Sequence, residues 1–317
     1  DSAHFKWSPI VYRAYPGEKP VFTGGLEFSG TAELKAPEKL SQLPEGSKGK
    51  VKVIDLKAKG FDDFAPQAAF GYRPKKPCHT VTDLYRDGKP LDVAVSPNPD
   101  IRLEDYYRIG EVLDKKHDVF KADFPDMDKW AKEEDVMAQG WWTFLWASTT
   151  IPVEKIDPVA KTVTVAREPN IFYYAATSNN VFTLENGLPA LDRENEWVFD
   201  RKNGLAYVLE PKGAKAPVYT VTRLAKPMIT VTDVNNFRIE GLTFEYGRTD
   251  AIIVSNAVNF AFLGNTVRNF GGRGLQVYEA KEARVQNNTF HHFGFAALIL
   301  TGGDRPTLTP GMCIIEN

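Results

Sequence analysis

The sequence predicts an all-β protein whose C-terminal part winds into a right-handed parallel β-helix, with a β-rich domain inserted earlier in the chain. The first observation is a fixed period of 23 residues between 228 and 317. Apolar residues recur at equivalent positions of this period, namely Ile229, Ile252, Leu275 and Leu298, and Val231, Val254, Val277 and Leu300. The second observation is that apolar residues alternate within each repeat, which is typical of strands. Three short strands per repeat then form one coil, and parallel crossovers make the coiling right-handed.

Small and polar residues mark the corners of each coil. Gly241, Gly264 and Asn287 share one position of the repeat, and Asn265 and Asn288 share the next. Gly and Asn tolerate a left-handed backbone, and stacked Asn amides can hydrogen-bond from coil to coil. We therefore expect these asparagines to form a structural ladder at the turns and to have no catalytic role.

The chain divides into three segments. Residues 1–25 contain an alternating run around Pro16-Gly17 and are expected to form an early coil of the β-helix. Residues 26–220 depart from the 23-residue period and are expected to form the inserted β-rich domain, and residues 221–317 form the main coils. Aligning the last residues with the repeat places Asn317 in mid-coil, so we expect the natural protein to continue beyond it.

The insert is expected to be rich in β-hairpins. Turn signals at Asp87-Gly88, Asp157-Pro158 and Lys202–Gly204 each separate two alternating segments. Only the stretches Arg102–Leu113 and Asp126–Met137 are expected to be helical. Three clustered tryptophans either pack in a core or stack against sugar rings, and both interpretations stay open: Trp141, Trp142 and Trp146.

Composition excludes several classes of protein. The 317 residues include 39 basic and 41 acidic side chains, so the net charge of −2 argues against nucleic acid as the partner. No apolar run approaches the roughly 18 residues that a membrane-spanning helix needs. Two cysteines, Cys78 and Cys313, do not make a disulfide scaffold and are expected to be free thiols. No pattern predicts a metal site or a cofactor, and the first residue, Asp1, hints at export.

Candidate catalytic residues lie where the repeat places carboxylates in neighbouring coils. Glu279 occupies one position of the repeat, and Asp304 follows two residues after the equivalent position of the next coil, in an inserted loop. Because neighbouring coils lie about 4.8 Å apart, these carboxylates are expected roughly 5–9 Å apart, which spans the separations of retaining and inverting glycosidases. Asp304 and Glu279 are therefore the predicted acid/base pair. The alternatives are a solvated turn for Glu279, and a turn or a salt bridge to Arg305 for Asp304.

Five further residues are predicted to bind substrate: Arg305, Arg248, His292, Tyr278 and Arg273. A guanidinium group matches a carboxylate or sulfate on a sugar in two parallel hydrogen bonds. Arg273 has an alternative role, because it stacks over Asp250 at the spacing of one repeat and so suits a surface ion pair. His291 and His292 are expected to point to opposite sides of their strand, so we do not expect them to bind a metal together.

Several segments resemble the bacterial right-handed parallel β-helix proteins related to glycoside hydrolase family 141. They occur in the order of that family and are PIVYRAYPGEKPVFTGG, LYRDGKPL, SPN, YRIGEVLD, GWWTFLWA, EWVFDRKNGLAYVLEP, IEGLTFEYGRTD and GGDRPTLTPG. The similarity covers essentially the whole chain and implies a pectate-lyase-like solenoid. It also implies a secreted or periplasmic enzyme that acts on complex polysaccharides, with fucosidase or xylanase activity and acidic catalytic residues on the helix surface. Val95-Ser96 departs from the family pattern, and coils after Asn317 are expected to complete the active site.

Three functions remain open at this point. The favoured one is a glycoside hydrolase that uses paired carboxylates, and its substrate is a polysaccharide or oligosaccharide. The second is a polysaccharide lyase that acts on uronates by β-elimination, with Arg273, Lys281 or Arg284 near the abstracted proton. The third is a solenoid that binds carbohydrate without catalysis. Fold alone does not distinguish them.

Overall fold

The computed structural model describes residues 8–64, 67, 69–71, 81–98, 100, 102–114, 119–166, 176–213 and 216–317. The chain forms two compact units. The first contains the described residues up to Leu26, residues 81–83 and Thr220–Asn317. The second contains the described residues between Glu27 and Tyr219 other than 81–83.

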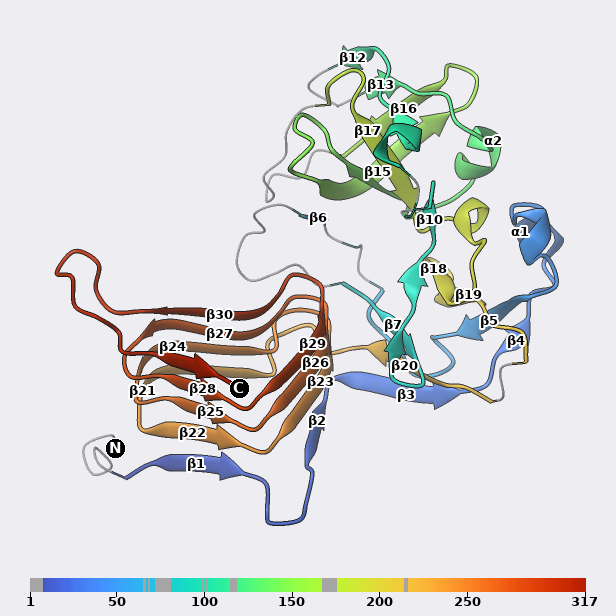
Figure 1. Ribbon diagram of the computed structural model, residues 1–317. Helices are drawn as coiled ribbons and strands as arrows, with labels where there is room; N and C mark the ends of the chain where they lie inside the picture. Colours follow the sequence, from blue (N-terminus) through green and yellow to red (C-terminus); the bar gives the residue numbers. More distant parts are fainter. Residues whose placement is uncertain are drawn as a thin grey trace. The chain divides into compact units, whose positions relative to one another are not determined.

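The first unit is a solenoid of parallel strands (Figure 1). Its described strands form three sheets, here named I, II and III. Sheet I has the order β21 (Ile229–Asn235), β24 (Ile252–Val258), β27 (Arg273–Ala280), β30 (Ala296–Gly302). Sheet II has the order β1 (Ile10–Arg13), β22 (Phe237–Glu240), β25 (Ala261–Leu263), β28 (Arg284–Gln286), β31 (Ile314–Glu316). Sheet III has the order β2 (Val21–Thr23), β23 (Thr243–Gly247), β26 (Thr266–Phe270), β29 (Thr289–Phe293).

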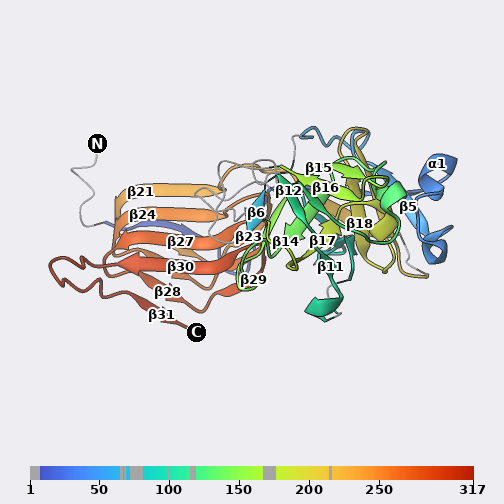
Figure 2. The ribbon, with the colours of Figure 1, turned by 90° about the horizontal axis from the view of Figure 1, so that it is seen from above.

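The register of these sheets confirms the predicted fold class. Ile229 pairs with Ile252, Ile252 with Leu275 and Leu275 with Leu298, so each coil repeats after 23 residues. The N-terminal strand β1 pairs in parallel with β22, with Ile10 opposite Phe237. Viewed from above, the four strands of sheet I lie side by side as a continuous layer (Figure 2).

The core of the solenoid contains aromatic side chains that stack from one coil to the next. Phe244 and Phe262 stack with ring centroids 6.3 Å apart, and Phe262 and Phe290 stack at 6.2 Å. Phe237 and Phe260 form a parallel stack of the same kind. Burying each such side chain contributes about 1.5–3 kcal/mol, so the inward positions hold the coils together.

Each coil turns at residues with a left-handed backbone. They fall into four columns, each repeated from coil to coil: Asp233, Asn256 and Glu279; Asn236, Asn259 and Glu282; Gly241, Gly264 and Asn287; Tyr246, Asn269 and His292. This backbone is disfavoured for most residues, and Asn, Asp and Gly adopt it at the lowest cost. The predicted asparagine ladder is confirmed, because the Asn265 N–H donates to Asn288 Oδ1 at 2.8 Å.

The second unit is built mainly of antiparallel strands. One sheet has the path β10 (Val95–Ser96), β17 (Val181–Glu185), β14 (Met137–Gly140), β15 (Thr149–Asp157), β16 (Thr162–Val165), β13 (Val119–Lys121), β12 (Val112–Asp114), with β11 (Tyr107–Arg108) on β17 and β6 (Phe70–Gly71) on β15. Another has the order β4 (Ala32–Glu33), β5 (Val51–Asp55), β19 (Leu205–Leu209), β18 (Glu196–Asp200), β9 (Asp92–Val93). A further sheet has the order β3 (Gly25–Ser29), β20 (Val218–Thr222), β7 (Leu84–Arg86), β8 (Lys89–Pro90), and its strands β3 and β20 include residues of both units.

The hairpin predictions are confirmed and one helix prediction is wrong. The turns at Asp87-Gly88, Asp157-Pro158 and Lys202–Gly204 connect the antiparallel pairs β7–β8, β15–β16 and β18–β19. Arg102–Leu113 is not a helix, because after one 3₁₀ turn its backbone pairs with β17 as strand β11. In Asp126–Met137 only α2 (Met127–Trp130) is helical. The other described helices are α1 (Pro37–Leu40) and the 3₁₀ turns Glu45–Ser47, Leu103–Asp105 and Leu188–Ala190.

The clustered tryptophans have different environments. Trp142 is 1% exposed, lies in the core of the second unit and donates its Nε1–H to the Thr149 carbonyl at 3.0 Å. Trp146 is 62% exposed and its ring stacks on Phe144 at 5.3 Å. Trp141 packs against Tyr106 at 5.6 Å. Core packing therefore accounts for Trp142.

Candidate functional site

Glu279 projects from a bulge at the end of a sheet I strand. Between β27 and β30 the pairing passes from Val277–Leu300 to Ala280–Gly302, so β27 has one extra residue there. Glu279 lies in this bulge with a left-handed backbone (φ 53°) and an exposed side chain. Its N–H donates to Thr301 Oγ1 of the next coil at 3.4 Å. The bulge therefore turns the carboxylate outward, at the boundary with the coil that carries Asp304.

Asp304 begins the inserted loop of that next coil. Its N–H donates to the Thr309 carbonyl at 2.8 Å and the Thr309 N–H donates back at 2.9 Å, which closes the loop. Asp304 Oδ2 accepts a hydrogen bond from Thr307 Oγ1 at 2.5 Å, so the carboxylate is oriented by its own loop. Asp304 and Arg305 are both exposed. Glu279 and Asp304 thus come from adjacent coils at the same end of sheet I.

Tyr278 lies on the outer face of sheet I, next to Glu279. Leu275 and Val277 point into the core, so Gln276 and Tyr278 occupy outward positions. Tyr278 donates its hydroxyl proton to Gln276 Oε1 at 2.5 Å. Tyr278 is half-buried and Gln276 is only 1% exposed.

Two of the predicted substrate-binding arginines are buried at the other end of sheet I. Arg248 is 1% exposed and Arg273 is 3% exposed. Arg273 lies 3.4 Å from Asp250 Oδ2, and Asp250 Oδ1 also accepts the Arg273 N–H at 2.8 Å. The predicted ion pair is confirmed, but its expected position at the surface is wrong, because the turn between sheets III and I folds both side chains inward. Burial raises the pKa of Asp83 to about 7, although the positive charge of Arg248 acts to lower it.

The two adjacent histidines lie together at the end of sheet III. His291 Nδ1 and His292 Nδ1 are 3.1 Å apart, and His292 Nδ1 is 3.0 Å from Asn269 Oδ1. The prediction that they point to opposite sides is wrong, because the left-handed backbone of His292 (φ 59°) breaks the strand alternation. Burial, His292 and Arg268 lower the pKa of His291.

The predicted residues therefore form two groups at opposite ends of sheet I. Arg273 begins β27 and Glu279 is its next-to-last residue. Six steps along a strand cover roughly 20 Å. Arg248, Arg273 and His292 therefore belong to one end, and Glu279, Asp304, Arg305 and Tyr278 to the other. The second group contains both predicted carboxylates.

The second unit holds carboxyl groups with raised pKa values that the sequence did not predict. A hollow of about 340 Å³ is lined by acidic side chains that include Glu185 and Glu196. Burial alone raises the pKa of Glu185 to about 7. Burial also raises the pKa of Glu196 to about 7, although the N–H groups of Asp192 and Arg193 donate to its carboxylate. No local pattern marks them, because they come from strands that pair with distant segments.

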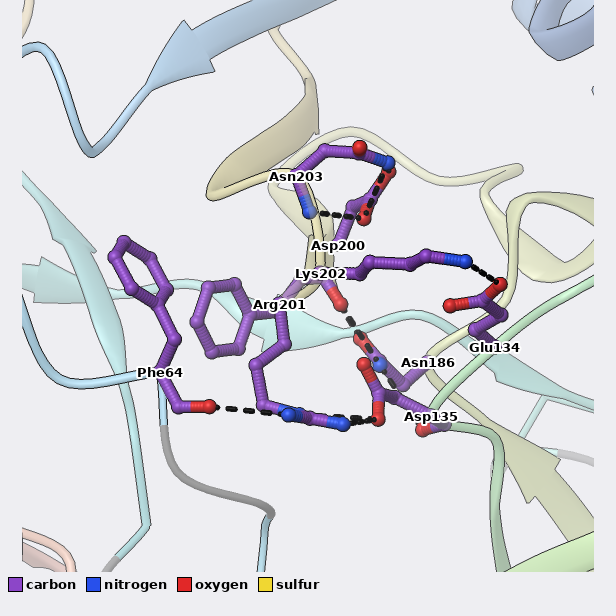
Figure 3. Close-up of polar contacts among 9 residues, drawn as sticks. Phe64, Glu134, Asp135, Asn186, Asp200, Arg201, Lys202 and Asn203 are labelled. Carbon is purple, nitrogen blue, oxygen red and sulfur yellow. Dashed lines mark hydrogen bonds and ion pairs between the residues drawn. The ribbon is translucent and has the colours of Figure 1, made fainter.

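A polar cluster of the second unit surrounds the β18–β19 turn (Figure 3). Arg201 pairs with Asp135 at 2.5 Å and donates to the Phe64 carbonyl at 3.1 Å. Asn186 Oδ1 accepts from the Phe199 N–H at 2.7 Å. Beside this cluster, a hollow of about 160 Å³ is lined by Glu133, whose pKa burial raises to about 7.

Comparison with known proteins supports the fold. Residues 227–311 match the family of right handed beta helix regions. This part of the chain is a right-handed parallel β-helix. No curated protein matches the sequence. A solved structure named "Glycoside hydrolase" matches with a TM-score of 0.59 and 14% sequence identity. The match covers 90% of this chain and 61% of that one, so this chain spans less than two thirds of its length.

Three further observations concern other kinds of site. In the described residues, no set of three or more His, Cys, Asp or Glu side chains is arranged to hold a metal ion. No helix in the part of the chain that the structure describes is long and apolar enough to cross a membrane. Cys313 is a free thiol, as expected, while Cys78 lies outside the described residues.

Proposed function

We propose that the chain belongs to a glycoside hydrolase that cleaves glycosidic bonds in a complex polysaccharide. The observation that carries the proposal is the pair Glu279 and Asp304, which emerge from adjacent coils at one end of sheet I. The name of the structural neighbour, "Glycoside hydrolase", supports a carbohydrate substrate. Secretion or a periplasmic location in bacteria, as the family resemblance implies, belongs to the same proposal.

The two carboxyl groups have different settings and so suit different roles. Asp304 is oriented by Thr307 and is proposed to activate water or to attack the anomeric carbon. Glu279 extends from a bulge without such a constraint and is proposed to protonate the leaving oxygen. Arg305 and Tyr278 flank the pair and are proposed to position the sugar. A lyase mechanism through Arg273 is disfavoured, because its guanidinium is buried and paired with Asp250.

The test measures new reducing ends from a panel of polysaccharides. Glu279→Gln and Asp304→Asn are each expected to lower turnover by about 10²–10⁴-fold, the usual contribution of general acid or base catalysis. Asp233→Asn is the matched control, because Asp233 occupies the same column as Glu279 two coils earlier and bonds Asn256 at 2.6 Å. The control is expected to keep full turnover.

Three outcomes would contradict the proposal. Unchanged turnover in both variants removes Glu279 and Asp304 from the mechanism. Products that absorb in the near ultraviolet indicate elimination and a lyase. Saturable glycan binding without new reducing ends indicates a binding solenoid.

A further inference from the structure

The outer face of sheet I differs from the outer faces of the other two sheets in charge. Its four strands, all described in full, carry neutral side chains at the outward positions between their ends. Six of these positions form two columns across the coils: Ile253, Gln276 and Ile299, and Thr232, Ser255 and Tyr278. We call these six residues the neutral face.

Sheets II and III present charge at the corresponding positions. Arg238 and Arg284 are exposed on sheet II, and Arg268 pairs with Glu245 on sheet III at 2.6 Å. On sheet I the charged residues lie toward the strand ends: Arg273 is buried, and Asp233 and Glu279 share a column of left-handed residues. The absence of charge is therefore a property of this face and not of the solenoid.

The neutral face offers hydroxyl and amide groups at a regular spacing. Thr232 Oγ1 and Ser255 Oγ lie 3.4 Å apart in adjacent coils. Successive coils are about 4.8 Å apart, which is close to the length of one pyranose residue in an extended chain. Ile253 and Ile299 add apolar surface that suits the C–H face of a sugar ring.

Gln276 supplies a hydrogen-bond donor without a partner. Its Nε2 is buried and makes no hydrogen bond, while its Oε1 accepts from Tyr278. A buried donor left unpaired costs free energy, so a ligand acceptor at this point is favoured. A sugar hydroxyl that reaches Nε2 would provide that acceptor, while Tyr278 stays bonded to Oε1.

We infer that the neutral face binds an uncharged polysaccharide chain lying along the solenoid axis, about one sugar per coil. The inference rests on the proposed function, because the column Thr232, Ser255, Tyr278 leads to Glu279 and so places the bound chain beside the proposed catalytic pair. A polyuronate or sulfated glycan carries a charge on successive sugars and needs cations along its path. The neutral face provides none.

The test measures binding separately from turnover. Neutral xylo-, cello- and manno-oligosaccharides and anionic oligogalacturonate are titrated at low and high salt, with binding followed by calorimetry. At least one neutral series is expected to bind with an affinity independent of salt, and oligogalacturonate is expected to bind at least about tenfold more weakly. Ser255→Lys is expected to weaken neutral binding by about tenfold and to create salt-dependent binding of oligogalacturonate.

Thr266→Lys is the matched control, since it adds the same charge to the same coil on sheet III. It is expected to leave neutral binding unchanged, and thermal unfolding checks that both variants fold. The inference is overturned if oligogalacturonate binds more tightly than every neutral series, if no neutral series binds, or if both lysine variants act alike. Neutral binding without cleavage contradicts the proposed hydrolase and leaves the inference standing. Hydrolytic cleavage of a polyuronate overturns the inference and leaves the proposed hydrolase standing.

Discussion

The backbone N–H of Asn265 donates to the side-chain oxygen of Asn288, its equivalent in the next coil, at 2.8 Å. Asn265 Oδ1 in turn accepts the Leu242 N–H at 2.9 Å, and its amide donates to the Ile239 carbonyl at 3.0 Å. Each coil therefore satisfies backbone groups of its neighbours through one buried amide. Asn265 is therefore required to hold neighbouring coils together, beyond its suitability for a turn.

Asn265→Ala is expected to destabilise the protein by about 2–4 kcal/mol. The change leaves two buried backbone groups without partners, and each costs about 1–3 kcal/mol. Urea unfolding followed by circular dichroism measures the effect. Asn235→Ala is the control, because Asn235 is an exposed residue of β21 without a left-handed backbone. Equal losses in both variants would contradict the importance of the buried ladder.

Arg273→Met is expected to destabilise the protein by about 3–5 kcal/mol, because it leaves the Asp250 carboxylate buried without its ion-pair partner. Adding Asp250→Asn to Arg273→Met removes that charge and keeps an acceptor for the residue 273 N–H, so it is expected to recover much of the loss. A double-mutant cycle of unfolding free energies measures the coupling. A coupling of zero would show that the pair contributes nothing beyond two independent side chains.

The coils could be predicted from sequence because their pattern is local and repeated. The column Ile229, Ile252, Leu275 gives the strand positions, the period and the register at once. Glycine and asparagine at the corners predict the left-handed turns for the same reason, since the backbone requirement recurs in every coil.

Features that depend on distant contacts could not be predicted. The burial of Arg248 and Arg273 is decided by the path of the turn, whereas their charge suggests exposure. Arg102–Leu113 does not form the predicted helix, because β11 within it pairs with β17, which is distant in the sequence. The hollow at Glu185 joins strands from separate parts of the chain, so no spacing marks it.

Arg201→Ala is expected to destabilise the second unit by about 1–3 kcal/mol. It removes the ion pair with the partly buried Asp135 and the hydrogen bond to the Phe64 carbonyl (Figure 3). Lys202→Ala is the control, since the neighbouring pair Lys202–Glu134 is exposed and worth at most about 1 kcal/mol. Denaturant unfolding of both variants separates the two cases. An equal loss of stability in Lys202→Ala would show that the burial of an ion pair does not decide how much the pair stabilises the second unit.

The raised pKa of Glu185 predicts a loss of stability as pH rises. The folded-state pKa is about 7 and the ordinary value is 4.5, so the folded state binds more protons than the unfolded state between these values. Stability from this group is fully present below pH 4.5 and is lost as the pH rises through about 7. Glu185→Gln is expected to remove this contribution and to be about 1–3 kcal/mol more stable relative to wild type at pH 8 than at pH 4.5.

Unfolding free energies of wild type and Glu185→Gln across this pH range measure the difference. Glu196 and Glu133 also have raised pKa values, so both proteins keep a falling slope and only its size changes. Glu154→Gln is the control, because Glu154 is an exposed residue of β15 and is expected to follow the wild-type curve. Parallel curves for wild type and Glu185→Gln would mean that the Glu185 carboxyl is ionised in the folded state. The hollow would then have to supply it with water or a cation that offsets its burial.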